Sequence, residues 1–265
     1  RGALRQRISD FNNYVKQGAP FLGADGRYYF FRNDGLKNQS VLYRSDKPVG
    51  GKEEVFLDPN SLSDDGTVAL TGTSMSNDGR YMAYTISRSG SDWTEIYVLD
   101  TETGRLLDDH IEWAKFTDAA WWKDGFFYSA YDRPVAGKEF SNANENHRIY
   151  YHKLGTPQSS DVLAFEDKEH PLHFHTAYVP ENERSLFVFV GGQGFGEGMM
   201  VKDLTRPDAK WVVMEPSQDY SNSVVDVIGD DVYILTSADA QRNRLVKAPA
   251  TNRNTSTPAR SITGV

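Results

Sequence analysis

Short runs in which apolar and polar residues alternate fill most of the chain, and turn residues separate them. The clearest runs follow the Asp-Gly pairs at positions 25–26, 78–79 and 124–125, and each is rich in aromatic residues. Weaker copies of the same pattern begin at Asn182 and Asp230. Alternation with a period of two predicts half-buried strands. A repeat of about fifty residues that holds several strands is typical of a β-propeller.

We expect an all-β fold built from four-stranded antiparallel blades. The second repeat is the most complete, with strands predicted at residues 71–76, 80–87, 94–100 and 104–107. In the third repeat, residues 116–122 are predicted to form the inner strand. The pattern divides the propeller segment, residues 16–265, into five blades: 16–67, 68–112, 113–168, 169–217 and 218–265.

Both ends of the chain depart from this repeat. In residues 1–15, Leu4, Ile8 and Phe11 have helical spacing, which predicts a short leading helix or linker. The last blade shows three strand patterns, and residues 252–260 show none, so we expect that blade to be incomplete. Because the chain opens on Arg1 rather than Met, we interpret it as a fragment or a processed chain.

Composition removes several classes of function. The net charge is −8, which argues against a nucleic-acid partner. There are no cysteines, so disulfides and thiolate chemistry are excluded. No run of eighteen apolar residues occurs, so we expect no membrane partner.

The residues offer little catalytic chemistry of their own. A serine hydrolase of the α/β type needs Gly-x-Ser-x-Gly, and no serine here has glycine both two positions before and two positions after it. Ser74 comes nearest, and we interpret its segment as an inner strand. The glycine-rich stretch 191–198 runs from one predicted strand into another, so we interpret it as a hairpin loop and not a phosphate-binding loop. The acidic turn at residues 63–66 lacks the spacing of an EF-hand.

Histidines gather at residues 170–175. His173 and His175 are two residues apart, a spacing that places both on one face of a strand and could begin a metal site. The sequence identifies no third ligand. We therefore predict no metal and no cofactor, and expect these histidines to line the polar face near the central channel or a loop at its rim.

Four stretches, 28–43, 56–70, 89–93 and 150–159, closely resemble the propeller of the prolyl oligopeptidase family and follow its order. The resemblance is strong over residues 1–167 and continues more thinly to about residue 248. It implies a cytoplasmic or periplasmic serine endopeptidase that cleaves short peptides after proline. In that family a seven-bladed propeller caps an α/β-hydrolase domain, excludes folded proteins and contributes to substrate binding.

By this resemblance, the chain holds the leading helix and about five of the seven blades. Its partners would be short proline-containing peptides and the α/β-hydrolase domain of the same protein, which carries the Ser-His-Asp triad and has no counterpart in this sequence. We therefore expect no catalytic residue in this chain, and no activity from the chain alone.

The resemblance also implies two substrate-binding residues. Phe116, directly after Lys115, matches a family phenylalanine that lines an apolar pocket beyond the proline subsite. Phe174 falls where relatives commonly have methionine after tryptophan, and it is also large and apolar. The alternative interpretation for both is packing between blades.

Two other functions remain open at this stage. One is a stand-alone β-propeller that binds a peptide or protein through its central channel. The other is a five-bladed carbohydrate enzyme, which needs two inward carboxylates at glycosidase separation.

Overall fold

The computed structural model of the chain describes residues 1–135, 137, 144–249 and 263–264. Apart from one α-helix and two short 3₁₀ turns, its regular elements are antiparallel strands, so the all-β prediction is confirmed. The chain divides into two compact units, Arg1–Glu112 and Trp113–Val265.

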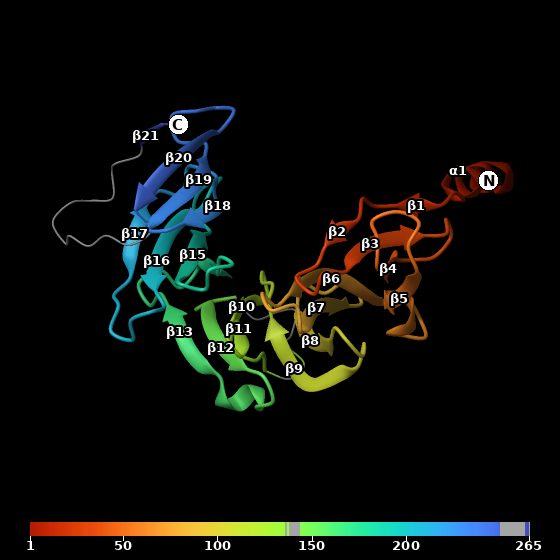
Figure 1. Cartoon of the computed structure of the whole chain (residues 1–265), viewed down its shortest axis with the longest axis horizontal. Coiled ribbons are helices and arrows are strands. Elements are labelled where there is room, and N and C mark those ends of the chain that lie inside the picture. Colours follow the sequence, from red (N-terminus) through yellow and green to blue (C-terminus); the bar gives the residue numbers. More distant parts are fainter. Residues whose placement is uncertain (136, 138–143, 250–262, 265) are drawn as a thin grey trace. The chain divides into compact units, whose positions relative to one another are not determined.

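The first unit contains the helix and the strands of the first two repeats (Figure 1). The first repeat comprises α1 (Gly2–Asn12), β1 (Lys16–Gln17), β2 (Phe21–Leu22), β3 (Tyr28–Asn33), β4 (Val41–Ser45), β5 (Glu53–Leu57) and the 3₁₀ turn η1 (Pro59–Ser61). The second comprises β6 (Val68–Met75), β7 (Tyr81–Arg88), β8 (Thr94–Asp100) and β9 (Leu106–Ala114). The last two residues of β9 belong to the second unit, where Ala114 pairs with Ala130.

The second unit contains the strands of three further repeats (Figure 1). In chain order these are β10 (Ala120–Trp122), β11 (Gly125–Ala130), β12 (Arg148–Lys153), the 3₁₀ turn η2 (Gln158–Ser160) and β13 (Val162–Glu166); then β14 (Phe174–Tyr178), β15 (Ser185–Gly191), β16 (Gly198–Asp203) and β17 (Val212–Glu215); then β18 (Asn222–Ile228), β19 (Asp231–Thr236), β20 (Arg244–Pro249) and β21 (Thr263–Gly264). From the second repeat to the last, sequence neighbours are also neighbours in the sheet, which is the meander expected of a propeller blade. In the first repeat, β3, β4 and β5 follow this order, and β1 and β2 both pair with β3.

The turn before the second strand of a repeat is built the same way three times. The side chains of Asp25, Asp78 and Asn182 each accept a hydrogen bond from the backbone N–H two residues further on, at 3.0 to 3.1 Å. Such side-chain bonds fix the turn without help from the sheet. This local chemistry explains why the repeat is visible in the sequence.

The third copy of the turn differs. Lys123, not Gly125, takes the left-handed conformation, at φ 50°. Gly125 begins β11 directly against the carbonyl oxygen of His152, where a Cβ atom would overlap that oxygen. The glycine here is needed for a close approach of two strands.

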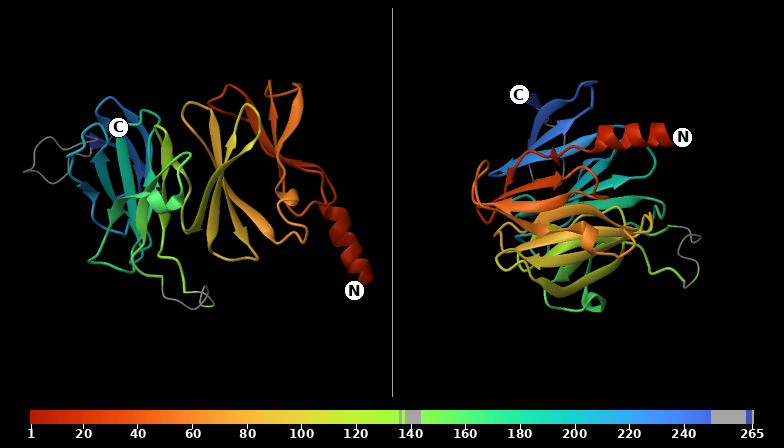
Figure 2. Two further views of the ribbon diagram at one scale, coloured as in Figure 1. Left: turned by 90° about the horizontal axis from the view of Figure 1, so that it is seen from below. Right: turned by 90° about the vertical axis from the view of Figure 1, so that its right-hand side faces the viewer.

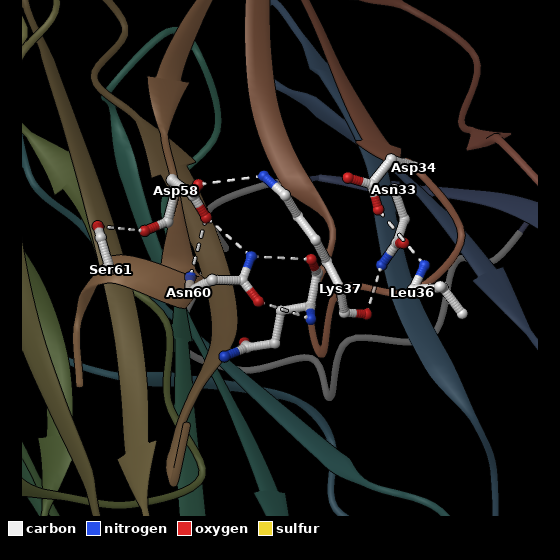
Figure 3. Close-up of polar contacts among 8 residues, drawn as sticks. Asn33, Asp34, Leu36, Lys37, Asp58, Asn60 and Ser61 are labelled. Carbon is white, nitrogen blue, oxygen red and sulfur yellow. Dashed lines mark hydrogen bonds and ion pairs between the residues drawn. The ribbon is translucent and has the colours of Figure 1, made fainter. Parts of the chain in front are cut away.

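A polar network ties the β3–β4 loop to η1 in the first unit (Figure 3). Asp58 caps η1 by accepting the N–H of Asn60, and Lys37 pairs with Asp58 at 3.4 Å. The Asn60 side chain exchanges two hydrogen bonds of 3.0 Å with the backbone of Gln39. The Gln39 side chain in turn accepts the N–H of Leu70 in β6, so the network joins the first repeat to the second.

The core lies between the sheets of successive repeats. In the first unit, Tyr29, Leu42, Phe56, Met82 and Tyr84 belong to one buried cluster. The described part of the second unit shows two such clusters. One holds Phe127, Ile149, Leu186 and Val188, and the other holds Phe187, Met199, Val232, Ile234 and Val246.

The leading helix is confirmed, but its apolar residues are not buried. Leu4, Ile8 and Phe11 are all exposed, and no residue of α1 is buried. Seen from a second direction, the helix extends away from the strands of its unit (Figure 2). Helical spacing therefore predicted the element correctly without predicting a packing partner.

Two strand predictions need correction. The inner strand of the third repeat is Ala120–Trp122, so residues 116–119 of the predicted strand are not in it. In the last repeat, where three strands were predicted, β21 pairs with Val246 and Lys247 as a fourth. The stretch 252–260 lies outside the described residues, and the blade boundaries stay predictions.

Candidate functional site

The two phenylalanines singled out in the sequence lie together in the second unit. Phe116 and Phe174 have ring centroids 5.6 Å apart and ring planes inclined by 48°. This is within the range in which aromatic rings attract one another. Phe116 is 50% exposed, although it is a large apolar side chain. Phe174 is half-buried, so Phe116 is the more accessible ring of a pair that could meet an apolar ligand group.

Phe116 lies outside the sheet because the side chain of Thr117, not a strand backbone, bonds to β11 at this point. The Thr117 hydroxyl accepts the backbone N–H of Ser129 in β11, at 2.9 Å. The N–H of Lys115 bonds to the carbonyl of the same serine. Between these two bonds, Phe116 adopts φ 52°, a left-handed conformation that costs a bulky residue about 1–2 kcal/mol. This local arrangement is why the predicted strand over 116–122 starts late.

Phe174 is positioned by a glycine on the neighbouring strand. It is the first residue of β14, and its partner in the β14–β15 ladder is Gly191. A Cβ atom at Gly191 would overlap the Phe174 ring. The absence of a side chain at Gly191 therefore lets the ring lie across the strand.

One imidazole holds the backbone on both sides of this pair. His147 Nε2 lies 3.0 Å from the carbonyl oxygen of Lys115, the residue before Phe116. His147 Nδ1 accepts the N–H of His175, the residue after Phe174, at 2.8 Å. Since Nδ1 is an acceptor, the ring proton of the neutral imidazole is on Nε2, which donates to Lys115.

The environment of His147 keeps it neutral. Its side chain is fully buried, against Tyr131 and Phe116. Burial lowers the pKa of His147 to about 4, although the bond to the Lys115 carbonyl opposes the shift. Burial likewise lowers the pKa of His175. Both imidazoles therefore act as hydrogen-bonding spacers near neutral pH.

We expected His173 and His175 to line the polar face near the central channel or a loop at its rim, and His173 does lie in the loop before β14. Both are buried. His175 packs edge-on against Phe165, and its Nδ1 lies 2.9 Å from the carbonyl oxygen of His147. His173 precedes β14, so the two do not share a strand face. Alternation could not show this, because the partners are distant in sequence.

His147 is the residue that sequence reasoning missed. Its two bonded partners lie 32 and 28 positions away, in segments before β10 and at β14. A single histidine at the start of a predicted strand gives no indication that its ring bonds to two distant backbone segments.

The other candidate motifs are structural. Residues 191–198 join β15 to β16 as a hairpin, as predicted, and Gly196 N–H and Glu197 N–H bond to the carbonyls of Gln218 and Tyr220. In the acidic turn, Asp65 accepts two hydrogen bonds from Thr67. Ser74 lies in β6, as its interpretation as an inner strand requires.

None of the helices in the described part of the chain is both long and apolar enough to cross a membrane.

Comparisons with known proteins give this geometry its context. Residues 1–262 match the family model described as "Prolyl oligopeptidase, N-terminal beta-propeller domain". The prolyl endopeptidase of Elizabethkingia meningoseptica is 41% identical over 254 residues, which cover 95% of this chain and 35% of that protein. The dual function macrocyclase-peptidase POPB of Galerina marginata is 32% identical, over 92% of this chain and 37% of that protein.

A solved structure agrees with both. Prolyl oligopeptidase B from Galerina marginata, bound to a 35mer hydrolysis and macrocyclization substrate, superposes with a TM-score of 0.83 at 28% identity. The match covers 94% of this chain and 38% of that one. The chain thus spans little more than a third of the length of these relatives.

Proposed function

Because the chain belongs to the prolyl oligopeptidase family, as its N-terminal β-propeller domain, we propose that it is the gating and substrate-selecting part of a serine endopeptidase. The whole protein would cleave short peptides after proline, in the cytoplasm or the periplasm. Acyl transfer by a Ser-His-Asp triad would come from an α/β-hydrolase domain that this sequence does not match.

The observation that carries the proposal is the Phe116–Phe174 pair, in which Phe116 is exposed and Phe174 half-buried. The propeller of a peptidase contributes to catalysis through binding, since it can hold the peptide while another domain cuts it. Two adjacent aromatic rings, one at the start of β14 and one in the segment before β10, suit an apolar side chain of the substrate. A histidine that fixes the backbone on both sides supports a role that depends on orientation.

The first prediction concerns the chain by itself. Incubated with a fluorogenic proline-containing peptide, it is expected to release no fluorophore above the buffer rate and to resist labelling by a serine-directed fluorophosphonate. The physical reason is the absence of any Gly-x-Ser-x-Gly nucleophile in the sequence.

The same preparation distinguishes the alternatives. Cleavage that the fluorophosphonate abolishes would contradict the assignment of catalysis to another domain. Binding of the intact peptide with micromolar affinity or better, lost in Phe116→Ala but kept in Phe195→Ala, would favour a stand-alone binding propeller. Phe195 is the matched control because it is an exposed phenylalanine in the same unit.

A further inference from the structure

Three side chains of metal-ligand type converge in the loop between β13 and β14. Asp167 Oδ2 lies 3.0 Å from His170 Nδ1 and 3.4 Å from His173 Nδ1. The ligand atoms of the three residues all lie within 4.8 Å of one another. The two imidazole rings are nearly parallel, with centroids 4.5 Å apart, so both Nδ1 atoms face one carboxylate oxygen.

The loop is shaped before any ion arrives. Asp167 Oδ1 accepts the N–H groups of Glu169 and His170, at 3.0 and 3.2 Å. The N–H of His173 bonds to the carbonyl of His170, at 3.0 Å. These bonds occupy one oxygen of Asp167 and leave Oδ2 to the two histidines. A cation would therefore meet a largely preorganised set of donors.

The buried member of the group is poorly satisfied. His173 is 6% exposed, and its Nδ1 has no hydrogen-bond partner among the residues that the structure describes. Its approach to Asp167 Oδ2 is close enough for attraction but lacks the geometry of a hydrogen bond. Buried polar atoms without a partner are uncommon in folded proteins, and some of them are ligands of a bound ion.

We propose that Asp167, His170 and His173 form a binding site for a divalent transition-metal ion, best matched by Zn²⁺. Zinc bonds to histidine and carboxylate at about 2.0–2.2 Å, so tetrahedral ligand atoms lie roughly 3.3 Å apart. The separations of Asp167 Oδ2 from the two Nδ1 atoms, 3.0 and 3.4 Å, lie on either side of that value. Two imidazoles and one carboxylate favour zinc over magnesium or calcium, which prefer oxygen ligands.

Gln218 determines which nitrogen of His173 carries the ring proton, and this matters for metal binding at Nδ1. Gln218 Oε1 accepts the N–H of Gln193, which turns Gln218 Nε2 toward His173 Nε2, at 3.3 Å. In that arrangement Nε2 of His173 accepts and Nδ1 carries the proton. An ion at Nδ1 requires the other neutral tautomer, in which this proton is on Nε2 and a half-turn of the Gln218 amide supplies its acceptor. This change of tautomer releases no net proton.

The metal site does not depend on the proposed peptidase function. Its effect on substrate binding through Phe174 does rest on that proposed function. His173 immediately precedes Phe174, the first residue of β14. An ion held by this loop would fix the segment that carries Phe174.

Isothermal titration of the metal-free chain with ZnCl₂ at pH 7.5 tests the proposal. We expect one ion per chain, with a Kd of about 10 μM or tighter. His170→Ala and His173→Gln are each expected to weaken binding at least about tenfold. Because His170 is exposed, His170→Ala should fold even if His173→Gln does not. MgCl₂ should produce no binding, because two of the three ligands are imidazole nitrogens.

His110→Gln is the matched control, since His110 also lies beside a carboxylate, Glu95, at 2.9 Å, but belongs to no three-ligand group among the described residues. Zinc binding should survive this change. The proposal is overturned if the parent chain binds no zinc, if folded His170→Ala binds as tightly as the parent, or if His110→Gln loses as much affinity as His170→Ala.

Discussion

Each ring nitrogen of His147 has one backbone partner, and those partners are the neighbours of Phe116 and Phe174 in the chain. Satisfying a fully buried imidazole in this way offsets the cost of removing it from water. It also opposes the strain of the left-handed Phe116 by holding the preceding carbonyl. A side chain that only filled space would need neither bond, so we assign His147 a positioning role.

This role predicts a specific loss of stability in acid. Burial lowers the pKa of His147 to about 4, so the folded chain resists protonation, and a protonated ring could no longer accept the N–H of His175. The unfolded chain takes up the proton near pH 6.5. The stabilising contribution is thus complete above pH 6.5 and is lost as the pH falls from there toward 4, at about 1.4 kcal/mol per pH unit.

Urea unfolding of the parent chain and of His147→Gln, between pH 7.5 and 4, measures this. The free energy of unfolding should fall more steeply with acid in the parent than in His147→Gln, and by about 3 kcal/mol in total. His110→Gln, at an exposed histidine, should follow the parent. Parallel pH profiles for the parent and His147→Gln would contradict the positioning role.

Among the elements, those that the sequence predicted well are set by local chemistry. Alternating runs and Asx-type turns identified β3, β7 and β8 closely, because their signals lie within a few residues. The inner strand of the third repeat was misplaced because Thr117 captures the Ser129 N–H, a contact across twelve residues. The bridging of His147 and the convergence of Phe116 with Phe174 depend on still more distant partners.

The helix α1 gives a prediction at this scale. It has eleven residues, none of them buried, and a helix this short is marginal in water without packing. Deleting residues 1–12 should therefore change the free energy of unfolding of this chain by less than about 1 kcal/mol.

Urea unfolding and hydrogen–deuterium exchange test the helix prediction together. Amides 5–12 should exchange far faster than those of β15. Phe187→Ala, which removes a fully buried ring in β15, should lower the free energy of unfolding by about 3–5 kcal/mol. This variant is the control for loss of core packing. A loss of several kcal/mol on deleting α1 would mean that its apolar face is buried in solution.

At the scale of the whole molecule, this chain corresponds to only one part of its longer relatives. The chain matches 35% of the Elizabethkingia meningoseptica prolyl endopeptidase, at 41% identity. Blades pack mainly through neighbouring sheets, so a segment of this size can carry its own core clusters. Whether Phe116 contacts the substrate, as we propose, can therefore be tested by exchange of the matching segment.

We expect a chimera in which this chain replaces the matching segment of that endopeptidase to cleave a proline-containing reporter peptide. In the chimera, Phe116→Ala should lower kcat/KM about tenfold for peptides with a large apolar residue before the proline, mainly through KM, because the lost ring contacts bind substrate and transition state alike. Peptides with glycine there should be nearly unaffected. Phe195→Ala should leave both rates unchanged, since that side chain is fully exposed in the β15–β16 loop. Equal losses for both peptides would assign Phe116 to packing between blades.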